Sequence, residues 1–362
     1  MPKVVLITGV SRFLGTNLAA QLAADPTVDR VIGIDSAQPR RADLPRLGRT
    51  EFVRADIRNP LIAKVIAQAH VDTVVHTPLL AAGRAASGSG FTRELALVGT
   101  MQLLSACQKS ESVRRIVIRS TTAVYGSGPR DPGVFTEDMH AVGYAARGYA
   151  KDAVEVEGYV RGFIRRRPDV PVTILRLASL VGPTIDSPMT RYLAMPIVPT
   201  SLGFDPRLQL LHESDALEVL QLATIGDTAA TAGVVNVAGD GIVLLSQAVR
   251  RAGRVRLPVP APAMAAVGGL VRNSGVLEVS AEHASFLNYG RVVDTTRLRT
   301  RFGFTPRYTT AQALDSYVAG RAALPPLATA ALRAAETMAL RMAGRSADPA
   351  RALSASTPAT VG

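Results

Sequence analysis

The stretch VVLITGVSRFLG, residues 4–15, decides the fold of this 362-residue chain. Its first five residues predict a buried strand, and a glycine-bounded turn separates that strand from a helix. A turn of this kind points backbone N–H groups and the positive end of a helix at a phosphate. Gly9 allows the tight turn, and Gly15 allows the helix to pack close to the strand. The sequence therefore predicts a diphosphate-binding turn made by Gly9, Arg12, Phe13, Leu14 and Gly15.

Short apolar runs alternate with helix-length amphipathic stretches through the first half of the chain. This alternation predicts βαβ units and an α/β fold, a doubly wound parallel sheet of the Rossmann type. The expected strands are Val4–Thr8, Val31–Asp35, Glu51–Val53, Thr73–His76, Arg115–Ser120 and Val172–Arg176. The expected helices are Asn17–Ala24, Ile62–Ala69, Glu94–Lys109 and Lys151–Arg166.

The pattern loosens after residue 177, where prolines interrupt the chain. We predict a Rossmann domain in residues 1–177, a smaller C-terminal substrate lobe with returning Rossmann segments in 178–322, and a tail rich in Ala and Arg in 323–362. Further helical patterns occupy Ser214–Ile225, Ala311–Ala322 and, in the tail, Leu327–Ala343. The tail helix is basic enough for a membrane surface, but docking on the protein followed by a disordered end is the simpler prediction.

Composition narrows the class of protein. Cys107 is the only cysteine, which excludes a disulfide framework, and no histidine has metal-ligand spacing, so no metal is expected. The strand at residue 4 stands where a signal peptide would be, and the apolar stretch 258–270 is too short to span a bilayer. We therefore expect a cytoplasmic protein without membrane contact.

The net charge is +12, but the arginines are scattered and tryptophan is absent. Solvated helix faces or a pocket for an anionic nucleotide explain this charge more simply than nucleic-acid binding, the weakest hypothesis.

Acidic residues follow the second and third strands. Asp35 lies 20 residues past Gly15, where a carboxylate accepts hydrogen bonds from an adenosine ribose. Because Asp35 would repel a phosphate on that ribose, it favours NAD over NADP. Asp56 and Ile57 follow the third strand. For Asp56 the order of elements favours a place at the adenine edge over the alternative, a helix cap.

These elements, in this order, resemble the extended short-chain dehydrogenase/reductases, and within them the NAD-dependent epimerase/dehydratase group of UDP-glucose 4-epimerase-like proteins. The resemblance covers roughly residues 3–320 and implies bound NAD, a nucleotide-sugar substrate such as a UDP-sugar, and a homodimer formed by the helices at 94–109 and 151–166. Besides the turn and Asp35, the matching segments are ADIR (55–58), VVH (74–76), STTAVYG (120–126), FTED (135–138), ILRLA (174–178), LLHESD (210–215), VNVAG (235–239) and DTTRL (294–298).

In that family a Ser or Thr, a Tyr and a Lys share the proton chemistry, with the tyrosine phenolate as base and the lysine as its stabilising cation. The resemblance assigns Thr121 and Lys151 to two of these roles. The tyrosine is expected four residues before the lysine, where this chain has Arg147, which has no lone pair to accept a proton. Tyr149 lies about 200° around the helix from Lys151 and should face elsewhere. Tyr144 lies about 10 Å along the axis, and a shifted helix start would make it the base.

Three further positions bear on the same site. Arg12 stands at the family's middle glycine, so its side chain either pairs with the diphosphate or obstructs it. Ala96 stands where the family commonly has Asn. His76 ends a strand, where packing near the cofactor is favoured over catalysis or metal binding. The departures leave two leading hypotheses: an NAD-dependent nucleotide-sugar epimerase or dehydratase, and a catalytically degenerate NAD(H)-binding protein with a sensor or scaffold role.

Overall fold

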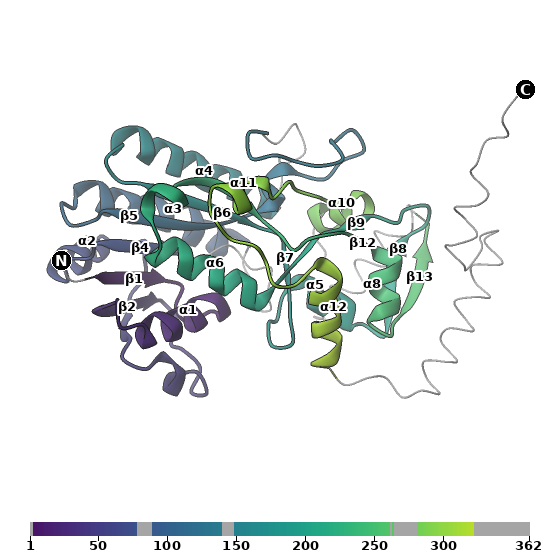
Figure 1. The fold of residues 1–362 in the computed structure, drawn as a ribbon, viewed down its shortest axis with the longest axis horizontal. Coiled ribbons are helices and arrows are strands. Elements are labelled where there is room, and N and C mark those ends of the chain that lie inside the picture. The colour runs from purple at the N-terminus through teal and green to yellow at the C-terminus, as the bar shows by residue number, and fades with distance from the viewer. Residues whose placement is uncertain (1–2, 78–88, 140–147, 261–262, 264–280, 322–362) are drawn as a thin grey trace, which may run out of the picture.

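A seven-stranded parallel sheet forms the larger of two lobes in the computed structural model, which describes residues 3–77, 89–139, 148–260, 263 and 281–321 (Figure 1). The strand order is β11-β6-β5-β4-β1-β2-β3, and every neighbouring pair is parallel. The expected α/β class and doubly wound sheet are therefore confirmed. The strands are β1 (Val4–Thr8), β2 (Arg30–Asp35), β3 (Glu51–Arg54), β4 (Thr73–His76), β5 (Arg115–Thr121), β6 (Val172–Leu177) and β11 (Gly233–Val237).

Different helices cover the two faces of this sheet, because alternate strand residues point to opposite sides. Val5 and Ile7 of β1 belong to a core cluster shared with α1 (Phe13–Ala24) and α6 (Glu213–Ile225). Their neighbours on β1 belong to a second cluster, shared with α2 (Leu61–Gln68), α3 (Ser89–Lys109) and α4 (Gly148–Arg166). Strands buried on both faces explain the nearly continuous apolar runs of the sequence.

The smaller lobe lies beside the carboxyl ends of the sheet strands, at the right of Figure 1. Its core joins short elements from several parts of the chain. Its strands are β7 (Ser179–Val181), β8 (Ile197–Ser201), β9 (Arg207–Leu208), β10 (Leu210–His212), β12 (Val243–Leu244) and β13 (Val255–Val259). The remaining elements are η1 (Leu44–Leu47), η2 (Thr122–Tyr125), α5 (Pro188–Ala194), α7 (Thr228–Thr231), α8 (Leu245–Arg251), α10 (Ala281–Tyr289), α11 (Thr296–Thr300) and α12 (Thr310–Ala319).

The expected strands and helices lie within a few residues of the observed ones, and β1 and β4 match at both ends. Strand β11 was not predicted, although it completes the main sheet beside β6. The tail helix expected at Leu327–Ala343 lies outside the described residues. No helix in the described ranges is long and apolar enough to cross a membrane.

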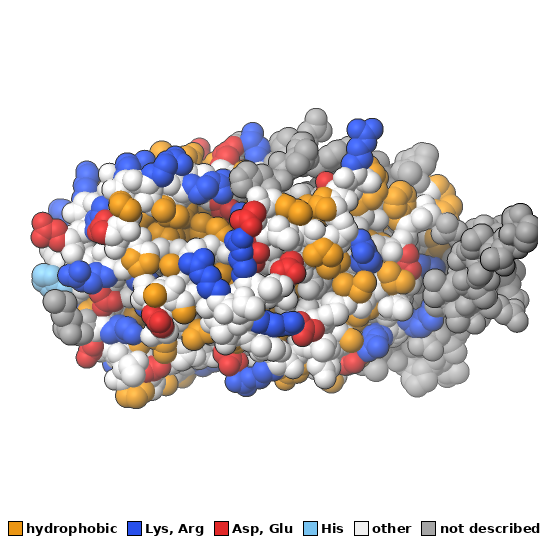
Figure 2. All heavy atoms as spheres, turned by 45° about the horizontal axis from the view of Figure 1, so that its top comes forward, with side chains coloured by type: hydrophobic (Ala, Val, Ile, Leu, Met, Phe, Trp, Pro, Cys, Tyr) orange, Lys and Arg blue, Asp and Glu red, His pale blue; other side chains and the backbone are white. Residues whose placement is uncertain are grey.

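Three arginines cap helix C-termini from outside the helix. Arg49 donates to carbonyls at the end of α1, Arg167 to those at the end of α3, and Arg115 to those at the end of α6. The last carbonyls of a helix have no donor within the helix and carry its negative dipole end, so a guanidinium satisfies and stabilises them. On the face shown in Figure 2, basic side chains are interspersed with acidic and apolar ones. Part of the positive charge of the chain thus stabilises helix C-termini.

Candidate functional site

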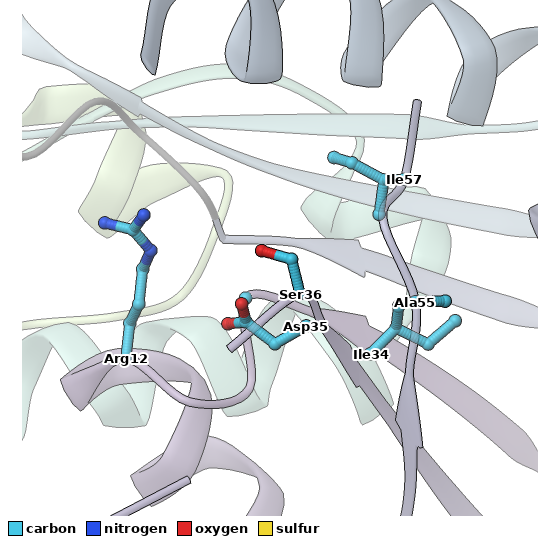
Figure 3. Close-up of a pocket in the computed structure, with 7 residues that line it drawn as sticks. Arg12, Ile34, Asp35, Ser36, Ala55 and Ile57 are labelled. Atoms are coloured by element: carbon cyan, nitrogen blue, oxygen red, sulfur yellow. The ribbon is translucent and has the colours of Figure 1, made fainter. Parts of the chain in front are cut away.

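A pocket opens where β1, β2 and β3 end, at the edge of the sheet that the sequence predicted for a ligand. Figure 3 shows Asp35 and Ser36 at this pocket, with Arg12 on one side and Ala55 and Ile57 on the other. Gly9 and Ile34 complete its lining. The carboxyl edge of an open parallel sheet is where α/β proteins bind their ligands.

The glycine turn has the geometry that its sequence predicts. Gly9 has φ +76°, a backbone conformation that side chains other than glycine rarely adopt, and its N–H donates to the Ile34 carbonyl at 2.8 Å. A Cβ on Gly15 would lie 2.2 Å from the Gly9 carbonyl oxygen, so the close approach is to the turn itself. Helix α1 begins after Arg12, whose side chain makes no capping hydrogen bond to the first-turn N–H groups of Phe13 and Leu14. These N–H groups point towards the same edge of the sheet.

Asp35 connects the end of β2 to the glycine turn. Its carboxylate accepts the Ser11 N–H at 3.2 Å through Oδ2 and the Ala37 N–H at 3.1 Å through Oδ1. The Ser11 hydroxyl donates to the Ala37 carbonyl at 2.6 Å, which closes the contact between the two loops. The side chain is half-buried and lines the pocket. Both oxygens keep lone pairs that a ligand hydroxyl could use.

Asp56 and Ile57 occupy different surroundings. The Asp56 carboxylate accepts the Arg58 N–H at 2.9 Å and pairs with the Arg58 guanidinium at 2.6 Å. These Arg58 hydrogen bonds lower the pKa of Asp56. Helix α2 has Pro60 at its N-cap, so Asp56 is not the cap of that helix. Ile57 lines the pocket and packs so closely on α3 that a Cβ on Gly99 would lie 2.6 Å from it.

His76 is a packed residue beneath the site. Its Nδ1 lies 2.7 Å from the Thr8 hydroxyl and its Nε2 lies 3.0 Å from the Thr100 hydroxyl. Burial lowers the pKa of His76 to about 4, so the ring is neutral near pH 7. With both ring nitrogens engaged by hydroxyls, His76 joins β1, β4 and α3. The sequence favoured packing near the cofactor over catalysis or metal binding, and its place beside the cofactor stays a prediction.

Thr121 and Lys151 come from elements that pack together, because α4 lies against η2. The half-buried Thr121 caps η2, with its hydroxyl accepting the Ala123 N–H at 3.2 Å, and it keeps its own proton to donate. The Lys151 Nζ lies 3.7 Å from Oε1 of Glu155, which is on the next turn of α4, and the Lys151 side chain is 45% exposed. Tyr144 and Arg147, the candidate base and its replacement, lie outside the described residues.

Tyr125 could be considered as a substitute base, but the structure commits it to the interior. Its hydroxyl donates to Asn236 Oδ1 at 2.7 Å and accepts from the Arg176 guanidinium at 2.7 Å. Its ring stacks on Phe135 with centroids 4.8 Å apart, and burial raises its pKa. Arg176 also forms a buried ion pair with Glu157 at 2.7 Å. This buried network packs against β5 and β6. Because the Tyr125 hydroxyl is engaged in it, Tyr125 is not available to the pocket as a base.

One cation at this edge escaped the sequence analysis. Arg119 lies on β5 two residues before Thr121, on the same face of the strand. The signal was a basic residue directly after the apolar run Ile116–Ile118. Among the residues that the structure describes, no three His, Cys, Asp or Glu side chains are grouped to hold a metal ion.

Residues 5–198 match the NAD dependent epimerase/dehydratase family. The chain belongs to this family. It is 49% identical to an uncharacterized protein of Mycobacterium tuberculosis, over 95% of this chain and 91% of that protein.

Two solved structures share the fold. The UDP-glucose 4-epimerase of Thermotoga maritima, solved with UDP-glucose, superposes with a TM-score of 0.66 at 18% identity, covering 88% of this chain and 98% of that one. The UDP-glucuronic acid 4-epimerase of Bacillus cereus, solved with NAD, gives 0.64 at 20% identity, covering 88% and 98%. At this identity the likeness establishes the architecture, and the chemistry has to be argued from the site.

Proposed function

We propose that the chain binds NAD at the carboxyl edge of its sheet and acts on a nucleotide sugar, most simply a UDP-sugar, as an epimerase or dehydratase. The observation that carries this proposal is the pocket that joins the glycine turn to Asp35. Gly15 leaves no room for a side chain beside the turn, and the first-turn N–H groups of α1 are uncapped, as a bound diphosphate requires. Asp35 supplies a carboxylate to a ribose, and a 2′-phosphate would be repelled there.

Each of the chain's own groups has a place in this proposal. Gly9, Arg12, Phe13, Leu14 and Gly15 hold the diphosphate, while Asp35, Asp56 and Ile57 surround the adenosine. Bound NAD supplies a hydride acceptor that can return the hydride to the same substrate. Thr121 orients a substrate hydroxyl, Lys151 provides positive charge beside it, and Tyr144 is the proposed base. His76 joins the ends of β1 and β4 to α3 through hydrogen bonds with Thr8 and Thr100.

A second function has its own support. The family position of the base is Arg147, which cannot accept a proton, and Tyr125 is held in a buried network. A protein that binds NAD(H) and senses its redox state, or acts as a scaffold, needs the adenosine end of the site and no base.

The test begins with the nucleotide released from purified, denatured protein, identified by ultraviolet spectrum and mass. Calorimetry with NAD and NADP follows, on the native protein and on Asp35→Asn. Losing hydrogen bonds to a charged group should weaken NAD binding about 10- to 100-fold. The control is Asp315→Asn, which removes an exposed carboxylate paired with Arg251 in the smaller lobe and should leave NAD binding unchanged. If the native protein binds neither dinucleotide, the proposal is wrong.

Turnover separates the two functions. UDP-glucose or UDP-galactose incubated with the protein and NAD should give the 4-epimer, and a wider panel of nucleotide sugars extends the search. Tight NAD binding without turnover on any of them would support the sensor or scaffold. Arg147→Tyr then tests the remaining site, since a gain of activity would show that only the base is lacking.

We also propose that the chain forms a homodimer through α3 and α4. Val98 and Met101 lie one turn apart on α3 and are 40% and 48% exposed, and Ile164 on α4 is 36% exposed. Light scattering should give twice the chain mass, and Met101→Arg should lower it. Ile242→Arg, at an exposed apolar residue of the smaller lobe, should not.

A further inference from the structure

Arg119 is a cation with few hydrogen bonds to the described residues. It lies near the carboxyl end of β5, where its Nη1 donates to the Thr77 carbonyl at 3.3 Å. Its Nε is buried and, within the part of the chain that the structure describes, has no hydrogen-bond partner. A guanidinium offers five N–H donors in a planar fork, and the described chain uses few of the five that Arg119 carries.

The surroundings of Arg119 disfavour its charged form. Burial lowers its pKa, the nearby Tyr149 phenol raises it, and the positive charge of Arg12 lowers it again. Among the described groups that shift this pKa there is no carboxylate. Arg12 reaches the same edge from the N-terminus of α1 and lines the pocket. Two like charges are therefore close enough to interact at this edge, and the Asp35 carboxylate lies in the pocket that Arg12 lines.

A buried guanidinium Nε without a hydrogen-bond partner is costly, and the cost is recovered when an anion pairs with the guanidinium. The planar fork fits two oxygens of a phosphate or a carboxylate at once. We propose that Arg119 and Arg12 together bind an oxyanion at the carboxyl ends of β4 and β5. This inference rests on the proposed function for the source of that oxyanion, which is either the diphosphate of the dinucleotide or an acidic group on the nucleotide sugar.

The position of Arg119 favours a ligand over a structural role. Thr121, the residue assigned to the substrate, shares its face of β5 two positions further along. The uncapped first turn of α1 begins after Arg12, so its backbone donors and the Arg12 guanidinium lie at the same sheet edge as the carboxyl end of β5, which carries Arg119. An arginine that served only the fold would be expected to use several of its donors on acceptors of the chain, as Arg115 does.

The test compares the native protein with Arg119→Gln, which keeps a polar side chain and removes the charge. The probes are inorganic pyrophosphate, adenosine, NAD, UDP-glucose and UDP-glucuronic acid, measured by calorimetry and thermal denaturation. We expect the oxyanion ligand to bind Arg119→Gln about 10- to 100-fold more weakly, and adenosine to bind equally well. Arg12→Gln should have a smaller effect because Arg12 is exposed. The matched control is Arg30→Gln, which removes an exposed arginine on β2 that pairs with Glu51 on β3. This variant should bind every probe as the native protein does.

The arms of the experiment distinguish the sources. Weaker binding of pyrophosphate and NAD assigns the site to the dinucleotide, whereas a loss confined to UDP-glucuronic acid assigns it to an acidic sugar. If the native protein binds pyrophosphate through Arg119 but not NAD, the proposed function fails and the oxyanion site stands. Unchanged binding of every probe by Arg119→Gln and Arg12→Gln overturns the inference.

A structural role predicts a different stability. If Arg119 served the fold, Arg119→Gln would lower the thermal midpoint of the ligand-free protein. The oxyanion site predicts a higher midpoint without ligand and a smaller rise on adding pyrophosphate. Should Arg119→Gln fail to fold, the inference is overturned, because the unpaired charge was then needed by the fold.

Discussion

Strand β5 carries an arginine near each end, and the two have opposite surroundings. Arg115 at the amino end donates to the carbonyls of Ala223, Thr224 and Gly226 at 3.2, 2.7 and 2.8 Å. Within the described residues, Arg119 at the carboxyl end has one long hydrogen bond, a buried Nε without a partner and Arg12 as a neighbouring charge. Both side chains lie on the same face of the strand.

The difference extends to the two edges of the sheet. At the amino edge arginine completes helix ends, and the fold itself supplies the acceptors. At the carboxyl edge Arg119 offers donors that the described chain leaves largely unused, and we propose that a ligand supplies their acceptor. The same residue type on one strand therefore serves stability at one end and, as we propose, recognition at the other.

Removing the satisfied arginine should have the largest effect. Arg115→Ala leaves the carbonyls at the end of α6 without their donor and opens a cavity. We expect the free energy of unfolding to fall by about 3 kcal/mol, measured by urea denaturation. The control is Arg30→Ala, whose exposed pair with Glu51 should contribute less than about 1 kcal/mol. Equal losses for the two variants would contradict the comparison.

Glycine positions test whether the carboxyl edge is built for close approach. Gly15→Ala puts a methyl group 2.2 Å from a backbone oxygen of the turn, and we expect a loss of about 2 kcal/mol together with weaker NAD binding. The matched control is Gly158→Ala in α4, where a Cβ meets nothing within 4 Å. That variant should gain about 0.5–1 kcal/mol, because alanine favours a helix. If Gly15→Ala is tolerated in both stability and binding, the turn is not constrained as described.

How much of this could be predicted depends on the distance along the chain between partners. The glycine turn, Asp35 and the bounds of β1 and β4 follow from local pattern, because each depends on neighbours in sequence. The capping by Arg115 could not be predicted, since its acceptors lie more than 100 residues away. The same holds for the Tyr125 hydroxyl and its partner Asn236. For these residues the sequence showed only that a polar group interrupts an apolar pattern.

Arg119 posed a harder problem. An arginine in a buried strand predicts partners for all its donors, and only the folded chain shows that, among the described residues, its Nε has none. His76 was easier, because a strand-end histidine without metal spacing is most simply a packed residue, and both its nitrogens are indeed engaged by threonines.

His76 gives the carboxyl edge a satisfied group whose effect depends on pH. Its folded pKa of about 4 lies below the ordinary value of 6.5, so the neutral ring stabilises the fold above pH 6.5 and that contribution is lost as the pH falls towards 4. Between pH 7 and pH 5 the free energy of unfolding should therefore fall by about 2 kcal/mol, measured from urea midpoints. His76→Gln should be less stable at pH 7 but should lose less between the two pH values. An unchanged pH dependence would show that His76 is not the titrating group.

The smallest effect addresses the repulsion between Arg12 and Arg119 directly. Without ligand, Arg119→Gln and Arg12→Gln should each stabilise the protein, and the double variant should gain less than the sum, because the first substitution already removes the repulsion. We expect a coupling of about 0.5 kcal/mol, small because Arg12 is exposed to solvent.

With pyrophosphate present the coupling should change sign, since both guanidinium groups then share one anion. The reference cycle pairs Arg12→Gln with Arg115→Gln, whose sites lie at opposite ends of the strands and should be additive in both conditions. A coupling that is the same with and without pyrophosphate would mean that the two arginines share no ligand. The carboxyl edge would then differ from the amino edge only in being less well satisfied, and the contrast along β5 would lose its functional meaning.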